Sequence, residues 1–168
     1  TVEEKTKIYT EIKKGRFKEL NESSSADQYN LLIDKCNNSG FIQYEISNFG
    51  KKGFFSKHNS NYWKGNEYLG IGPSAHSFNK KSRQWNVSSI NKYIKSIDNN
   101  LIPAKLEILS RDEKFNEYII TSIRTIWGVD LNLIKNRFGN NYYKNITKSY
   151  RKWLKSKDVT LKEDKIFL

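Results

Sequence analysis

The sequence of 168 residues is poor in sulfur: it contains no methionine and one cysteine, Cys36. A single cysteine excludes an internal disulfide, and it excludes zinc and iron–sulfur sites built from several cysteines of this chain. A translated reading frame begins with methionine, so a chain that starts at Thr1 and has none is expected to be a piece of a longer protein. The apolar end at residues 165–168 predicts that this piece stops inside a structural element.

Long hydrophobic runs are also missing. No stretch reaches the roughly 18 consecutive apolar residues that a membrane-spanning helix needs, and the first residues lack the apolar segment of a signal peptide. Aromatic residues make up 14% of the chain, which is too many for a disordered protein. We therefore expect a folded protein without a membrane span, in a reducing and cytoplasmic setting.

Acidic residues are few relative to basic ones, because 18 Asp and Glu face 30 Lys and Arg and give a net charge of +12. A basic excess of this size raises the question of nucleic-acid binding. The excess is densest over 144–157, where a predicted amphipathic helix has no acidic residue. Such a face is more often simply solvated, so nucleic acid is the less favoured partner. The basic residues of this segment are Lys144, Lys148, Arg151, Lys152, Lys155 and Lys157.

The first part of the chain has a mixed helix and strand pattern. Charged residues over 2–14 predict a helix, and the serines at 23–25 are candidate caps for a second helix that places Cys36 on an apolar stripe. The β-prone run over 41–49 then predicts one strand, which gives the αβ half of a βαβ unit. A short strand over 83–87 and a helix capped by a serine at 88 or 89 follow.

Beyond Pro103 the pattern becomes helical. Apolar residues at helical spacing predict a helix over 112–127, a second helix from Asp130 to Phe138, and then the basic helix. The last ten residues predict a β-hairpin. Three helices followed by a hairpin form a winged-helix-like plan, so we predict two domains, 1–104 and 105–168, in an α/β or α+β fold.

Two histidines are the main candidates for chemistry. His58 lies in a polar, aromatic stretch, where an imidazole can bind a metal or haem iron or act as a general base. The alternative, which spacing alone favours, is that His58 only hydrogen-bonds the loop together. Glu45, on the predicted strand, faces either a barrel interior or a site. The glycine-rich stretch 70–76 contains His76, and it lacks the third glycine of a dinucleotide fingerprint and the Lys-Ser/Thr of a P-loop.

Four stretches together resemble one protein family. They are Gln-Tyr-Glu-Ile-Ser-Asn-Phe at 43–49, His-Asn-Ser-Asn-Tyr-Trp at 58–63, Tyr-Leu-Gly-Ile-Gly-Pro-Ser-Ala-His-Ser at 68–77 and Arg-Gln-Trp-Asn-Val at 83–87. In this order and spacing they are similar to the oxygen-independent coproporphyrinogen III oxidase-like radical S-adenosylmethionine (SAM) family, specifically its HemW or haem chaperone branch. Gly-Val-Asp at 128–130 and Arg-Phe-Gly at 137–139 resemble the C-terminal helical domain of that family.

The resemblance implies a fold and two cofactors for the parent protein. Members of the family begin with a partial TIM-like barrel, whose Cys-x-x-x-Cys-x-x-Cys motif holds a [4Fe–4S] cluster that binds SAM. This chain lacks that motif. The resemblance therefore implies that 1–104 correspond to the C-terminal part of the barrel and 105–168 to the helical domain, and that this chain alone does not cleave SAM.

The resemblance also implies site residues. His58 becomes the candidate ligand of haem iron, with Tyr62 and Trp63 in support. Gly72, Ala75 and His76 become the candidate contacts of SAM in the parent. Ser74 departs from the pattern, because relatives commonly have glycine there, and the departure puts in doubt how closely this backbone approaches a ligand.

Three functions follow as expectations. The leading one is a haem-binding chaperone that delivers haem to an apo-haemoprotein. The alternative is an oxygen-independent coproporphyrinogen III oxidase, which decarboxylates its substrate in porphyrin biosynthesis, and the second alternative is a nucleic-acid-binding winged helix. Because the strand over 41–49 would have an unpaired edge without preceding strands, we also expect self-association or an altered arrangement of 1–104.

Overall fold

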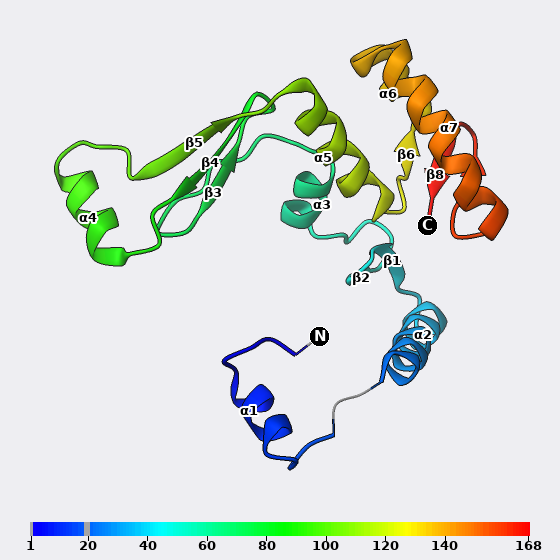
Figure 1. Cartoon of the computed structure of the whole chain (residues 1–168), viewed down its shortest axis with the longest axis horizontal. Helices are drawn as coiled ribbons and strands as arrows, with labels where there is room; N and C mark the ends of the chain where they lie inside the picture. Colours follow the sequence, from blue (N-terminus) through cyan, green and yellow to red (C-terminus); the bar gives the residue numbers. More distant parts are fainter. Residues whose placement is uncertain (1, 19–20) are drawn as a thin grey trace. The chain divides into compact units, whose positions relative to one another are not determined.

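The computed structural model describes residues 2–18 and 21–168, and the chain divides into two compact units, Thr1–Ile42 and Gln43–Leu168. The first unit contains helices α1 (Lys7–Lys13) and α2 (Glu22–Asn38), coloured blue to light blue in Figure 1. Neither helix has a fully buried residue. Cys36, expected to fill a core, is half-buried on α2.

Both helices of the first unit start at positions that differ from the predicted ones. The helix expected from residue 2 begins at Lys7, because the Thr6 side chain accepts the hydrogen bond of the Tyr9 amide. The second helix begins before the serines at 23–25, because the Asn21 side chain accepts from the Ser24 amide at 2.7 Å. Those serines therefore lie inside the first turn.

The single strand predicted over 41–49 is wrong: the structure has two short strands, β1 (Ile42–Glu45) and β2 (Asn48–Gly50), in a two-stranded sheet. Side chains stabilise the turn between them. The Gln43 amide donates to the Ile46 carbonyl at 2.8 Å, and the Asn48 amide donates to the Glu45 carboxylate. A pattern of β-prone residues does not show where such a turn falls.

The middle of the second unit is a three-stranded antiparallel sheet with two helices. Helix α3 (Lys57–Trp63) precedes strands β3 (His76–Phe78) and β4 (Ser82–Asn86), and helix α4 (Ile90–Asp98) precedes β5 (Ala104–Ile108). The order is β3-β4-β5, with Trp85 opposite His76 on one side and Lys105 on the other (Figure 1). The expected strand at 83–87 and the Ser89 cap are confirmed. The predicted division after residue 104 falls within β5, and the two domains remain a prediction.

The last part of the second unit has the winged-helix-like plan, with one additional strand. Its elements are α5 (Arg111–Ile123), β6 (Val129–Asp130), α6 (Leu131–Phe138), α7 (Asn140–Ser156), β7 (Thr160–Lys162) and β8 (Lys165–Phe167). The strands form a sheet in the order β6-β8-β7. Its core is made by buried Val129, Leu131, Ile134 and Ile166. The Asp130 cap and the terminal hairpin are confirmed.

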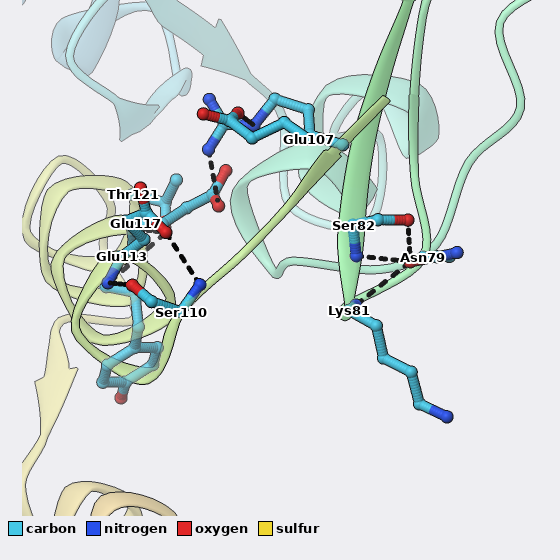
Figure 2. Close-up of polar contacts among 10 residues, drawn as sticks. Asn79, Lys81, Ser82, Glu107, Ser110, Glu113, Glu117 and Thr121 are labelled. Atoms are coloured by element: carbon cyan, nitrogen blue, oxygen red, sulfur yellow. Dashed lines mark hydrogen bonds and ion pairs between the residues drawn. The ribbon is translucent and has the colours of Figure 1, made fainter. Parts of the chain in front are cut away.

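Helix α5 ends four residues before the predicted end. The Arg124 carbonyl accepts from the Ile46 amide at 3.1 Å, and the Ile126 amide donates to the Tyr44 carbonyl at 3.2 Å. The chain after Ile123 therefore pairs with the end of β1 instead of continuing the helix. At its other end α5 starts with a capping box, in which Ser110 and Glu113 exchange hydrogen bonds, as Figure 2 shows.

No helix within residues 2–18 and 21–168 is both long enough and apolar enough to span a bilayer.

Candidate functional site

A cleft of about 240 Å³ lies in the second unit, between α3 with the chain that follows it and the helical part that begins with α5. Its lining combines rings and charges. The aromatic side chains are Tyr62, Trp63, Tyr68, Phe78, Tyr118 and Trp127, and the charged ones are Lys64, Lys114, Glu117, Asp130, Arg137 and Lys165. The site is therefore suited to a ligand that is both flat and charged.

Helix α3 supplies the aromatic wall of the cleft. The Ser56 side chain caps the helix, and this short helix turns Tyr62 and Trp63 toward the cleft at its last two positions. Their rings meet edge to face with centroids 5.0 Å apart, and Tyr68 lies 6.1 Å from Tyr62. The Trp63 Nε1 atom is buried and has no hydrogen-bond acceptor among the described residues.

Cation–π contacts join α3 to the end of α5. Lys64 Nζ lies 4.5 Å from the centroid of the Trp127 ring, and the Arg124 guanidinium lies 5.2 Å from that of Trp63. Behind this contact Arg124 forms an ion pair of 3.5 Å with Glu45, whose side chain is 1% exposed. Glu45 was expected to face either a barrel interior or a site. Its buried carboxylate instead fixes the position of Arg124, the arginine that covers the Trp63 ring.

The charges of the cleft are unbalanced toward the positive. Glu117 is paired with Arg83 at 3.1 Å, and Asp130 caps α6 by accepting from the Leu133 amide at 2.9 Å. Figure 2 shows Glu117 on α5, with a dashed line that marks its ion pair. The four cations of the lining (Lys64, Lys114, Arg137 and Lys165) have no ion-pair partner within the described part of the chain. Because Glu117 is paired with Arg83 and Asp130 caps α6, neither acid forms an ion pair with these four cations. The cleft therefore favours an anionic ligand.

Two tyrosines of the lining stay neutral at physiological pH. Burial raises the pKa of Tyr68, and the nearby Tyr62 and Glu117 raise that pKa further. Burial likewise raises the pKa of Tyr118, whose hydroxyl accepts a hydrogen bond of 2.9 Å from the Asp130 amide. These phenols therefore act as hydrogen-bonding groups and add no negative charge to the cleft.

The predicted haem residues are divided between the cleft and the surface. Tyr62 and Trp63 line the cleft, whereas His58 is exposed near the start of α3 and is not part of the lining. Residues four apart on a helix are neighbours on one face, so His58 lies one turn before Tyr62. The imidazole is accessible beside the cleft, not inside it.

The predicted SAM residues lie elsewhere, in the loop before β3 and at the first residue of that strand. The side-chain amide of Asn86 donates to the Gly72 carbonyl at 2.8 Å, and the Gly72 amide donates to the Tyr93 hydroxyl at 3.1 Å. The Ala75 carbonyl accepts from the backbone amide of Asn86 at 2.9 Å. These backbone groups thus already serve the fold, and His76, whose exposed side chain lines a second cleft of about 420 Å³, is the best placed of the three to contact a ligand.

Ser74 has an unusual backbone in that loop. Its φ of +61° lies in the left-handed region that favours glycine. A glycine would adopt this conformation without the strain that a serine side chain adds.

The α5 and β8 residues of the cleft are not among the site residues predicted from the sequence. Lys114, Glu117, Tyr118, Thr121 and Ser122 recur at helical spacing, so a polar stripe on one face of α5 was the available signal. Nothing local connects that stripe to α3, because the two are brought together by folding.

The residues present do not fit an iron–sulfur cluster. Such a cluster needs several cysteine thiolates, and the sequence has Cys36 alone. Across 2–18 and 21–168, no group of three or more His, Cys, Asp and Glu side chains is placed to hold a metal ion.

Comparisons with known proteins identify the family. The chain is 34% identical over 142 residues to heme chaperone HemW of Bacillus subtilis, which covers 84% of this chain and 36% of that protein. It is 30% identical over 143 residues to heme chaperone HemW of Lactococcus lactis, covering 85% of this chain and 38% of that protein. The chain thus spans little more than a third of the length of these relatives. No protein-family model matches it.

A structural comparison agrees with the sequence relatives. The fold matches coproporphyrinogen III oxidase HemN of Escherichia coli, a radical SAM enzyme, with a TM-score of 0.67 at 17% identity, over 89% of this chain and 38% of that one. This likeness confirms the expected α+β fold class. Together with the HemW relatives, it shows that the chain belongs to the HemW/HemN-like family of radical SAM proteins.

Proposed function

We propose that the protein is a haem chaperone, which binds haem as cargo and delivers it to an apo-haemoprotein. The observation that carries this proposal is the arrangement on α3, where an exposed His58 lies one turn from Tyr62 at the edge of an aromatic cleft. A neutral imidazole is a common ligand of haem iron. An accessible one beside flat rings suits a cargo that must be both bound and released.

The cofactors of the whole protein are part of the same proposal. SAM and a [4Fe–4S] cluster would be held mainly outside this chain, because its residues do not provide the cluster ligands. The exposed His76 is the side chain here that is best placed to contact SAM, since Gly72 and Ala75 use their backbone groups within the fold. A cytoplasmic setting also remains a prediction.

The oxidase alternative is less favoured. The relatives at 30–34% identity carry the name heme chaperone, whereas HemN is 17% identical and its likeness concerns the fold. Decarboxylation of coproporphyrinogen III by the full-length protein would favour this alternative instead.

The proposal is tested by titrating hemin into the full-length protein and recording the Soret absorbance. The wild type is expected to give a saturable one-to-one shift, which His58→Ala abolishes because the iron loses its ligand. His76→Ala is the matched control, since it removes the other exposed histidine and is expected to leave the shift intact. Unchanged binding in His58→Ala would refute the proposal.

A further inference from the structure

We infer that the cleft between α3 and α5 binds the carboxylate-bearing edge of a planar aromatic anion. Resting on the proposed function, this edge is that of the haem macrocycle, which then extends over Tyr62 to His58. The inference gives the cleft a role separate from iron ligation: it recognises the organic part of the cargo.

The charges of the cleft carry the first step. Its cations come from four places in the fold: Lys64 follows α3, Lys114 is on α5, Arg137 is on α6 and Lys165 is on β8. They have no ion-pair partner in the described residues, because the acids of the lining are engaged elsewhere. Cations that converge without carboxylates of their own are a site for carboxylates of a ligand.

The rings carry the second step. Tyr62 and Tyr68 present aromatic surface beside these cations, and a flat conjugated ligand stacks on such surface. The buried Trp63 Nε1 has no acceptor in the described part of the chain. Buried donors nearly always have one, so a donor without an acceptor at this wall is consistent with an acceptor that a bound ligand supplies.

The size of the cleft carries the third step. Pockets that enclose a whole drug-sized ligand measure roughly 300–1,000 Å³, whereas this one measures about 240 Å³. It therefore accommodates one edge of a tetrapyrrole, and the remainder lies outside. His58 is exposed one helical turn before Tyr62 and outside the cleft, where we place that remainder.

Protoporphyrin IX tests the inference independently of iron. It has the macrocycle and both carboxylates of haem but no metal, and its binding to the full-length protein is followed by quenching of tryptophan fluorescence. We expect His58→Ala to bind it as the wild type does, and the dimethyl ester, which lacks the negative charges, to bind the wild type at least tenfold more weakly.

Charge-removing variants locate the site. Lys114→Gln with Lys165→Gln is expected to weaken protoporphyrin IX binding at least tenfold, while keeping most of each side-chain stem. The matched control, Lys148→Gln with Lys155→Gln, removes the same charge from exposed positions on α7 and is expected to have little effect.

Two results overturn the inference: equal affinity of acid and ester for the wild type, or equal affinity of both double variants for the acid. The first comparison needs no variant, so it decides the matter even where the cleft variant fails to fold. Loss of hemin binding in His58→Ala with unchanged protoporphyrin binding in the cleft variant would leave the proposed function standing and remove this inference alone.

Discussion

Single residues in this structure have roles that local sequence did not reveal. Gly70 belongs to the glycine-rich stretch that also holds the predicted SAM residues, but its own environment explains it. A Cβ atom at this position would lie 2.1 Å from the carbonyl oxygen of His76. The close approach is therefore to the chain itself, at the point where the loop enters β3.

Gly70→Ala is accordingly expected to destabilise the protein strongly, because backbone must move to admit the methyl group. Gly72 is the control: it has a φ of +102° but no atom within 4 Å of a built Cβ, so Gly72→Ala meets only backbone strain, about 1–3 kcal/mol. Urea unfolding should rank Gly70→Ala below Gly72→Ala. Equal stabilities would contradict the close approach.

The ion pair of Glu45 and Arg124 gives a second prediction for single residues. Arg124→Met leaves the Glu45 carboxylate, 1% exposed, without its cation, and breaking a buried pair in this way costs about 3–5 kcal/mol. Glu45→Gln should cost less, since the Arg124 side chain is 36% exposed and remains solvated. Denaturant unfolding of both variants measures the difference, and the reverse order would show that the pair is not the source of stability.

At the scale of elements, the cap signals of α4 and α6 were reliable, whereas the serines at 23–25 did not cap α2. Ser89 and Asp130 start α4 and α6 as predicted, because the cap bond depends on residues a few positions apart. The end of α5 was mispredicted, because residues 124–126 pair there with the end of β1, about eighty positions away. The 41–49 run was mispredicted for a local reason, because a turn held by the Gln43 and Asn48 side chains divides it into two strands. Spacing of apolar and β-prone residues shows neither a distant partner nor the position of such a turn.

The capping box of α5 leads to a prediction with a defined pH dependence. Hydrogen bonding with Ser110, first through its side chain and then through its backbone amide, lowers the pKa of Glu113 below its ordinary value of 4.5. A carboxyl whose pKa is lower in the folded state stabilises the fold above the unfolded pKa, and this contribution is lost as the pH falls through the folded pKa. Ser110→Ala should therefore lower the unfolding free energy at pH 7, and the gap to wild type should narrow below pH 4.5.

Urea unfolding of both proteins at pH 7 and pH 3 measures that gap. A serine N-cap replaced by alanine typically costs about 1 kcal/mol. A gap that is the same at both pH values would show that Glu113 contributes nothing to the cap.

At the scale of the whole molecule, the motif at 58–63 could be recognised in the sequence, but the cleft beside it could not be predicted. The ion pair of Arg83 and Glu117 joins residues 34 positions apart, and Lys165 reaches the cleft from the last strand. No spacing rule connects such positions. His58 could be identified because it lies within a short motif. The cations of the cleft could not, because nothing in the sequence distinguishes them from the many surface lysines.

The basic face of α7 allows a prediction about partners. Helix α7 has no acidic residue, and Lys144, Lys148, Arg151, Lys152 and Lys155 are exposed on it. We expect any affinity for duplex DNA to be independent of sequence and to fall steeply with salt, because it comes from counterion release alone. Fluorescence anisotropy with two unrelated duplexes at several salt concentrations measures this. A clear preference for one duplex would revive the nucleic-acid function.

Self-association remains a prediction of the whole chain. Ile90, Ile94 and Ile97 on α4 are each about half exposed or more, which is unusual for one apolar stripe on a helix. Sedimentation velocity over a range of concentrations should reveal species larger than the monomer, and a strictly monomeric protein would count against the prediction.

The contacts between α3 and the end of α5 also bear on time. Lys64 on Trp127 and Arg124 on Trp63 link the two walls of the cleft directly, and the pairing of β1 with residues 124–126 supports that link from behind. Contacts of this kind oppose local opening of the chain. We therefore expect the cleft to keep its shape between one cargo and the next, so that it is already formed when a cargo arrives.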